Sequence, residues 1–233
     1  MDCQEEILRA LEGKIDDFYL AGGTALARFY FHHRESEDLD FFTQKFVRSK
    51  VFETTQEIEK NLKYGVELIN DYDKKGRVKV MIFMVRFKRK DLQKLDFVED
   101  PLKLMSELKI VDGIPVLSLE DIYLRKICTV AGTIESLDLT GRRIVMGGRQ
   151  EPKDFCDLYF LSQTSTSLSD FVMPNCNQVV KEGLIRWFRT YDRMQIKMGL
   201  LELKMKRQVD YQEMERHFKR EIERLIKKEI DFI

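Results

Sequence analysis

The sequence has 233 residues with 40 basic and 40 acidic side chains, so its formal net charge is zero. This balance argues against a protein that binds nucleic acid through bulk electrostatic attraction, and the length is enough to bury a core in one large or two modest domains. The four cysteines form no Cys-x-x-Cys pair, the N-terminus is acidic, and apolar runs stay well below the ~20 residues that span a bilayer. We therefore expect a cytoplasmic protein with no membrane association, no disulfide framework and no zinc site.

Hydrophobic periodicity predicts that helices and strands are mixed in the N-terminal half. In chain order we expect a helix over residues 5–16, an apolar run ending in a glycine turn over 18–23 and a second helix over 24–33. A strand over 38–42 and a third helix over 49–60 follow. Further strands are expected over 66–69, 78–87, 92–98 and 114–116. Residues 78–87 are apolar at both odd and even positions, which is typical of a strand inside a sheet.

The pattern from Ser118 onward is almost wholly helical. The last helix carries an apolar stripe made of Tyr211, Met214, Phe218, Ile222 and Leu225. We therefore predict an α/β (α+β) protein in which residues 1–117 form a mixed sheet with flanking helices and residues 118–233 form a helical domain.

Two aspartates mark the first candidate site. Side chains alternate along a strand, so Asp38 and Asp40 share one face while Leu39 points into the core. Two carboxylates on one face repel each other unless a cation lies between them, and Mg²⁺ suits such oxygen ligands. An isolated Asp-x-Asp is more often a solvated edge or turn feature, but the double glycine upstream favours the metal-binding interpretation.

The double glycine supplies the second candidate site. Gly22 and Gly23 lack a Cβ atom, so backbone N–H groups there can approach an anion closely, and a helix start adds unpaired donors. A triphosphate could be held at this turn. Thr24 can either cap the following helix or donate its hydroxyl to a phosphate.

These motifs together carry a family resemblance. The first motif is a Gly-Gly turn, a helix and then the run Arg-x-Ser-x-Asp-Leu-Asp-Phe-Phe, which starts at Arg34. It resembles the core signature of the nucleotidyltransferase fold of the DNA polymerase β superfamily. More narrowly, it resembles the AbiEii/AbiGii toxin family. The match continues with Asp96 on a later strand, with Lys126 after a helix-opening Asp-Ile, and with the run from Arg149 to Leu158, which contains Lys-Asp-x-x-Asp-Leu. The four motifs occur in this order between residues 18 and 161.

The resemblance implies a role for each site residue. Asp38, Asp40 and Asp96 would hold one or two Mg²⁺ ions, with Mn²⁺ as the alternative, and Asp96 would act as general base toward an acceptor hydroxyl. The substrate would be an NTP, whose phosphates would be bound by Gly22, Gly23, Thr24, Arg34 and Ser36. Lys126 would offset the charge of the triphosphate, and Asp154 would orient Lys126 or bind the nucleotide. The alternative for Lys126 is a solvent-facing charge, and for Asp154 a partner of the helix dipole.

The resemblance also implies an acceptor and a partner. It implies the toxin of a type IV toxin-antitoxin or abortive-infection system, with a cognate antitoxin, that modifies RNA such as a tRNA 3′ end or a protein hydroxyl. Other interpretations are a small-molecule nucleotidyltransferase of the antibiotic-resistance type and a non-catalytic nucleotide-binding module, although the complete carboxylate set argues against the module.

Two further stretches bear on the acceptor. A basic stripe could track an RNA backbone, or it could be a solvated helix face, which we favour; it contains Arg186, Arg189, Arg193 and Lys197, with Trp187 and Tyr191 available to stack on a base. A second basic tract covers residues 86–90. The segment 127–153 is longer than in the family and is expected to be an added loop near the active site.

Overall fold

The computed structural model of the chain describes residues 3–74, 77–87, 91–132, 134–137, 139–141, 143–146 and 148–231. The chain divides into two compact units. The first contains the chain up to Tyr30 together with Ser36–Asp121, and the second contains Phe31–Glu35 and the chain from Ile122 onward. The division lies four residues beyond the predicted boundary, and Phe31–Glu35 joins the second unit because His33 and Arg34 bind Asp157 there.

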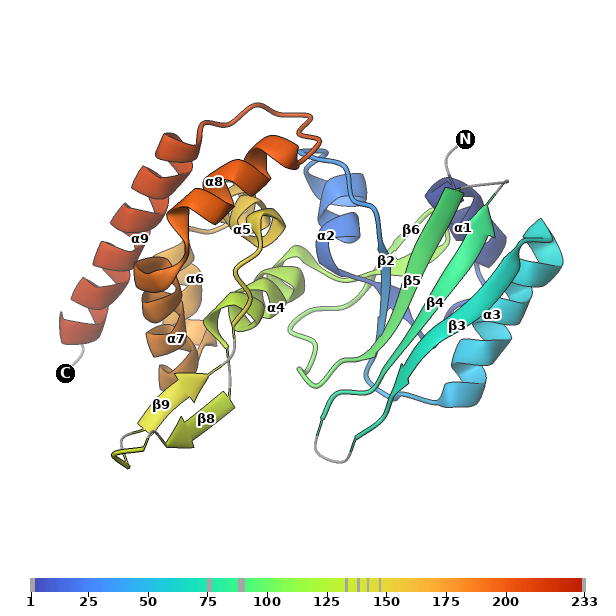
Figure 1. Ribbon diagram of the computed structural model, residues 1–233, viewed down its shortest axis with the longest axis horizontal. Coiled ribbons are helices and arrows are strands. Elements are labelled where there is room, and N and C mark those ends of the chain that lie inside the picture. The colour runs from blue at the N-terminus through green and yellow to red at the C-terminus, as the bar shows by residue number, and fades with distance from the viewer. Residues whose placement is uncertain are drawn as a thin grey trace. The chain divides into compact units, whose positions relative to one another are not determined.

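A mixed sheet forms the first unit, as predicted (Figure 1). Within the described residues it has seven strands in the order β3-β4-β5-β2-β1-β7-β6. Their bounds are β1 Tyr19–Leu20, β2 Leu39–Thr43, β3 Gly65–Tyr72, β4 Val80–Phe87, β5 Asp91–Glu99, β6 Lys109–Val111 and β7 Ile114–Val116. The β2–β5 and β1–β7 pairs are parallel and the other pairs are antiparallel.

One face of this sheet is covered by two helices, α1 (Cys3–Leu11) and α3 (Arg48–Leu62), which lie beside each other (Figure 1). The sheet residues on this face are fully or almost fully buried; they include Leu39, Phe41, Phe83, Leu95 and Phe97. Phe97 contacts Phe41 and Phe83 with ring centroids 5.4 and 5.8 Å apart. Because alternate residues point to the other face, the polar side chains of β2 and β5 are directed away from this core.

The strand β4 lies between β3 and β5, so the prediction of an interior strand is confirmed. Its two faces differ, however. Met81, Phe83 and Val85 are buried, whereas Ile82 and Met84 are only half-buried. The apolar residues on the second face lie on the same side of the sheet as the polar residues of β5.

The second unit is mostly helical, as predicted. Its helices are α4 Leu119–Ala131, which begins in the first unit, α5 Pro152–Thr164, α6 Leu168–Asn175, α7 Gln178–Thr190, α8 Arg193–Glu202 and α9 Tyr211–Asp231. The core surrounds Phe155, whose ring contacts Trp187, Tyr191 and Phe218. The predicted apolar stripe of α9 is confirmed, since Met214, Phe218, Ile222 and Leu225 are buried.

The long segment after α4 contains a hairpin in place of the expected loop. Its antiparallel strands are β8 Ile134–Leu137 and β9 Arg143–Met146, while residues 133, 138, 142 and 147 lie outside the described part. The hairpin returns close to α4, because Arg149 N donates to Thr129 O at 2.9 Å. A Cβ atom on Gly148 would lie 2.5 Å from Val130 O, so glycine permits this approach.

None of the described helices has both the length and the apolar character needed to cross a bilayer.

Candidate active site

The predicted metal-binding carboxylates share one face of the first unit's sheet. The parallel pairing of β2 with β5 sets Asp40 opposite Asp96 and Leu39 opposite Leu95. Because side chains alternate, Asp38 lies on the same face as Asp40, directly before the strand. Strand register therefore sets Asp96, which is distant in the chain, on the same sheet face as Asp38 and Asp40, with the buried leucines behind them.

A lysine that the sequence analysis did not single out lies among these carboxylates. Lys94 Nζ is 2.5 Å from Asp96 Oδ2 and 3.9 Å from Asp38 Oδ2. Burial would lower the pKa of Lys94, but the hydrogen bond and charge of Asp96, with the charges of Asp38 and Asp40, raise it. The signal in the sequence was its position, since a residue two before Asp96 on a strand must share its face.

The donor chemistry of the carboxylate cluster suits a hard divalent cation. Its donors are carboxylate oxygens, the ligand type that Mg²⁺ and Mn²⁺ prefer. The Asp38 side chain is 32% exposed and the Asp96 side chain 15% exposed.

The glycine turn lies directly against this cluster. Gly22 has a φ of +67°, and a Cβ atom at this position would lie 2.7 Å from Asp40 Oδ2. Ala21 N donates to Asp40 O at 3.0 Å, which fixes the turn to β2. Gly22 and Gly23 begin the short helix α2 (Gly22–Ala25), which continues as the π-helical turn η1 (Leu26–Tyr30). Glycine is therefore required at position 22 by both the backbone conformation and the carboxylate.

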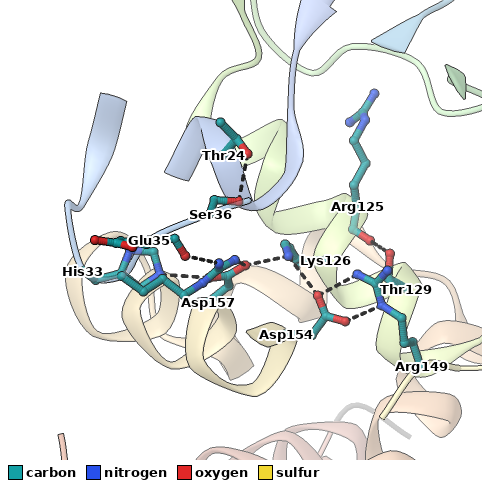
Figure 2. A network of polar contacts seen from close by, with 11 residues as sticks. Thr24, His33, Glu35, Ser36, Arg125, Lys126, Thr129, Arg149, Asp154 and Asp157 are labelled. Atoms are coloured by element: carbon teal, nitrogen blue, oxygen red, sulfur yellow. Dashed lines mark hydrogen bonds and ion pairs between the residues drawn. The ribbon is translucent and has the colours of Figure 1, made fainter. Parts of the chain in front are cut away.

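Thr24 ties the helix to the strand that carries the aspartates. The N-cap of α2 is Ala21, so the capping alternative for Thr24 is wrong. The buried Thr24 hydroxyl instead contacts the Asp38 carbonyl oxygen and Ser36 Oγ, the latter at 2.8 Å (Figure 2). Ser36 is held in turn through its carbonyl oxygen, which accepts from Gln4 Nε2 at 2.8 Å.

The other predicted site residues form a buried charge cluster in the second unit. Lys126 Nζ is 2.8 Å from Asp154 Oδ1 and 2.6 Å from Asp157 Oδ2 (Figure 2). Asp154 and Asp157 are three residues apart on α5, so one helix face presents both carboxylates to the lysine. Arg149 binds Asp154 through Nε and Nη2 at 2.5 and 2.8 Å. Lys126 is only 5% exposed, so the interpretation of a solvent-facing charge is wrong.

The charges in this cluster stabilise one another. Burial would lower the pKa of Lys126, but the carboxylates of Asp157 and Asp154 outweigh it and raise that pKa. Burial likewise opposes ionisation of Asp157, yet the charges of Lys126 and Arg34 hold its pKa well below the usual range. Lysine and carboxylates are therefore all ionised at neutral pH.

Arg34, predicted to contact phosphate, is engaged in the same cluster. Its Nε and Nη2 atoms donate to the two Asp157 oxygens, each at 2.8 Å, and Nη1 donates to Glu35 O at 2.9 Å. The neighbouring His33 Nε2 lies 2.8 Å from Asp157 Oδ1. His33, Cys156 and Asp157 present ligand-type atoms within 4.8 Å of one another, but the cations of Arg34 and Lys126 beside Asp157 would repel a metal ion.

The stacking interpretation of the basic stripe is wrong. Trp187 is 3% and Tyr191 2% exposed, because both pack around Phe155 in the core of the second unit. In the second basic tract, residues 88–90 lie outside the described part of the chain.

Comparison with known proteins gives the family. Among curated proteins, no sequence matches this chain. The crystal structure of JHP933 from Helicobacter pylori is similar with a TM-score of 0.56 and 18% identity, over 98% of this chain and 93% of that one. A crystal structure from H. pylori assigned provisionally as a nucleotidyltransferase has a TM-score of 0.55 and 20% identity, over 96% and 93% of the two chains. These likenesses show the fold.

The family model described as "Nucleotidyl transferase AbiEii toxin, Type IV TA system" matches residues 6–232. The match includes every residue of the carboxylate cluster and of the buried charge cluster. Since it spans nearly the whole chain, the protein belongs to the AbiEii family of nucleotidyl transferase toxins and is a nucleotidyltransferase.

Proposed function

We propose that the protein transfers a nucleoside monophosphate from an NTP to an acceptor hydroxyl, with Mg²⁺ bound by Asp38, Asp40 and Asp96. The observation that carries this proposal is the register of β2 and β5, which sets Asp40 opposite Asp96 on a half-buried sheet face in a chain of this family. Mn²⁺ is the expected substitute, because it accepts the same oxygen ligands.

The chain's own residues prepare the first unit for this reaction. Gly22 leaves room for the Asp40 carboxylate, and Thr24 fixes the backbone of Asp38 through its hydroxyl. A bound divalent cation supplies positive charge that neutralises the triphosphate and the leaving pyrophosphate. The acceptor oxygen forms a bond to the α-phosphorus, the bond from that phosphorus to pyrophosphate breaks, and the acceptor proton passes to Asp96. We assign the phosphate contacts to the backbone N–H groups of Gly22, Gly23 and Thr24 and to the Ser36 hydroxyl, because the Thr24 hydroxyl is used on Asp38 O.

Lys126 is a preorganised cation within the second unit. Lys126 has three N–H donors, and Asp154 and Asp157 take two of them. We assign the remaining donor to the triphosphate, with Asp154 as the residue that orients Lys126. Because Arg34 is bound on three nitrogens, we assign it to the support of Asp157, and its predicted phosphate contact stays a prediction.

The acceptor we propose is RNA such as a tRNA, with a protein hydroxyl as the other candidate. A groove in the second unit supports RNA, because Arg189, Arg216 and Lys219 line it together with Glu223, the Arg193–Glu215 ion pair and the apolar Phe188, Ile222 and Ile226. Such an excess of cations attracts a phosphate backbone. We further propose that the protein is the toxin of a type IV system, as the family description suggests. In this proposal it acts in the cytoplasm and is neutralised by a cognate antitoxin.

Labelled nucleotide transfer tests the proposal. The protein is incubated with Mg²⁺, each α-³²P-NTP in turn, and either total bacterial RNA or a bacterial protein extract. We expect label on a tRNA-sized band with one NTP and none with the Asp38→Asn/Asp40→Asn variant. The matched control is Asp91→Asn, which removes an exposed carboxylate from the same strand as Asp96.

The outcomes separate the candidates. Label on a protein band would move the acceptor from RNA to protein. Equal labelling by the double variant would overturn the metal assignment, and absence of label on both materials would overturn macromolecular nucleotidyl transfer.

A further inference from the structure

A single row of cross-strand neighbours runs through the carboxylate cluster. Asp40 on β2 pairs with Asp96 on β5, and Asp96 pairs in turn with Ile82 on β4. The next residue in the row is Asn70 on β3. Paired residues share one face of a sheet, so the row continues from the carboxylates onto Ile82. At its other end, Gly22 lies against Asp40. The carboxylates therefore have the glycine turn on one side and Ile82 on the other.

The order of the strands gives these two sides of the cluster different roles. The glycine turn follows β1 and leads into α2, on the side of β2 away from β5, whereas β4 lies on the far side of β5 (Figure 1). In phosphoryl transfer the attacking and leaving oxygens lie roughly in line, on opposite sides of the phosphorus. Since the proposed phosphate contacts are at the glycine turn, pyrophosphate leaves toward that turn. The acceptor hydroxyl must then approach from the side of β4.

Two apolar side chains of β4 line this approach. Ile82 and Met84 are two residues apart, so both lie on the face of the carboxylates. Both are half-buried, which leaves part of each side chain accessible, while Met81, Phe83 and Val85 of the same strand are buried in the core on the other face. A ligand that covers the accessible part of Ile82 and Met84 gains hydrophobic free energy. The group next to the acceptor hydroxyl is therefore expected to present an apolar surface.

The polar groups beside this apolar pair match a nucleotide. Asn70 is exposed, and its amide contains both hydrogen-bond donors and an acceptor. Arg86, two residues beyond Met84 on the same face, is 67% exposed and pairs with Glu67 at 2.6 Å. A nucleotide combines an apolar ring face, a polar base edge and a phosphate, and proteins bind unstacked bases between apolar as well as aromatic side chains. Because methionine is flexible and polarizable, such a surface suits more than one base.

We propose that Ile82 and Met84 form an acceptor subsite, which binds the nucleobase of the RNA nucleotide that carries the acceptor hydroxyl. Both are substrate-binding residues in this scheme: they contact the ring face of the base, and Asn70 lies where it can contact the base edge. The subsite places the hydroxyl over Asp96, the neighbour of Ile82 in the row. The inference rests on the proposed nucleotidyl transfer to RNA.

Protection from oxidation tests the acceptor subsite without any measurement of transfer. The full-length wild-type protein is treated with dilute hydrogen peroxide in Mg²⁺ buffer without NTP, and methionine sulfoxide at each position is followed by mass spectrometry. An excess of a single-stranded RNA hexanucleotide should slow the oxidation of Met84 at least about threefold, since the protected fraction follows mass action. Met198 is the control, because it is 52% exposed on α8 and should oxidise at the same rate with and without RNA.

Initial-rate kinetics test the same residues as contacts of the acceptor. The Ile82→Thr/Met84→Thr variant loses apolar surface and should raise the KM for RNA about tenfold, with the KM for NTP unchanged. The Ile82→Leu/Met84→Leu variant keeps an apolar surface and should keep the wild-type KM. Ile110→Thr is the matched control, since Ile110 is 67% exposed on β6 at the other edge of the sheet. Urea unfolding checks that each variant folds.

Each result separates the inference from the proposed function. Transfer to RNA with an unchanged KM for RNA in the threonine variant, or without protection of Met84, would overturn the acceptor subsite and leave nucleotidyl transfer untouched. If the threonine variant fails to fold, the protection of Met84 in the wild type decides. Labelling of protein alone, with no protection of Met84 by RNA, would overturn the nucleobase as the occupant. Protection of Met84 with no labelling of RNA or protein would overturn the proposed reaction alone.

Discussion

Gly22 lies so close to Asp40 that any Cβ atom on it would be 2.7 Å from Asp40 Oδ2. Gly22→Ala should therefore displace the Asp40 carboxylate and lower the rate of nucleotidyl transfer at least about tenfold. This loss corresponds to an increase of ~1.4 kcal/mol in the activation free energy. The positive φ adds a stability cost of about 1 kcal/mol. Transfer rates and urea unfolding of the variant measure the two effects.

The control for Gly22 is Gly13→Ala. Gly13 has nearly the same φ, +65°, but a Cβ atom there meets nothing within 4 Å. It should lose a similar amount of stability and keep its activity. Full activity of Gly22→Ala would contradict the proposed role of the close approach.

Asp157 should be the most costly carboxylate to neutralise in the second unit. It is fully buried and binds Arg34, Lys126 and His33. Removal of one partner from a buried ion pair costs about 3–5 kcal/mol, so Asp157→Asn should lower the free energy of unfolding in urea by this amount. Asp170→Asn is the control, because Asp170 is an exposed partner of Lys228 and such pairs contribute ~1 kcal/mol or less. Equal losses in the two variants would show that the buried cluster adds nothing to stability.

Stability should fall as the pH falls below neutrality, partly because of His33. Burial lowers the pKa of this ring, although Asp157 acts in the opposite direction. As the pH falls, His33 of the unfolded chain takes up a proton near pH 6.5, while the ring in the folded protein stays neutral. The unfolded state therefore binds more protons. The free energy of unfolding then falls by up to ~1.4 kcal/mol for each unit by which the pH is lowered. Urea unfolding at pH 7.5, 6.5 and 5.5 measures this slope.

The variant His33→Gln should reduce the slope. It should not remove it, because burial also lowers the pKa of His217. His32→Asn, at the exposed neighbouring position with a φ of +49°, is the control and should keep the wild-type slope. An unchanged slope in His33→Gln would show that His33 is not the group that titrates.

Trp187 should report on the core of the second unit and not on RNA. It is the single tryptophan of the chain, and its ring lies 5.6 Å from Phe218 and 5.8 Å from Phe155. Native emission should be blue-shifted, weakly quenched by acrylamide and unchanged by added RNA, and it should shift to the red on unfolding in urea. Quenching of the native protein by RNA would restore the stacking interpretation.

The segment that carries the proposed metal ligands Asp38 and Asp40 could be predicted because its signals are local. Alternation placed Asp38 and Asp40 on one face, and the adjacent glycines indicated the turn. Local alternation also places Lys94 on the face of Asp96, but its approach to Asp38 depends on the register between β2 and β5, which are about fifty residues apart in the chain and whose pairing no local pattern specifies.

The basic stripe shows what helical spacing in the sequence cannot predict. Arg186 and Arg189 recur at helical spacing, but spacing alone does not say which neighbours face the core. Trp187 belongs to the buried face of α7 because its apolar contacts come from α5 and α9, distant segments that the stripe itself does not reveal. Burial of Lys126 was likewise hidden, since it needs the carboxylates of α5, 28 and 31 residues onward.

The assignment of Phe31–Glu35 to the second unit gives the chain an interleaved connectivity. The polypeptide passes between the units after Tyr30, after Glu35 and after Asp121. A single cut by a protease at any one of these links would leave the units covalently joined. A gene fragment ending at residue 121 would encode His33 and Arg34 without the Asp157 carboxylate that they bind, so no single division of the chain separates the two units.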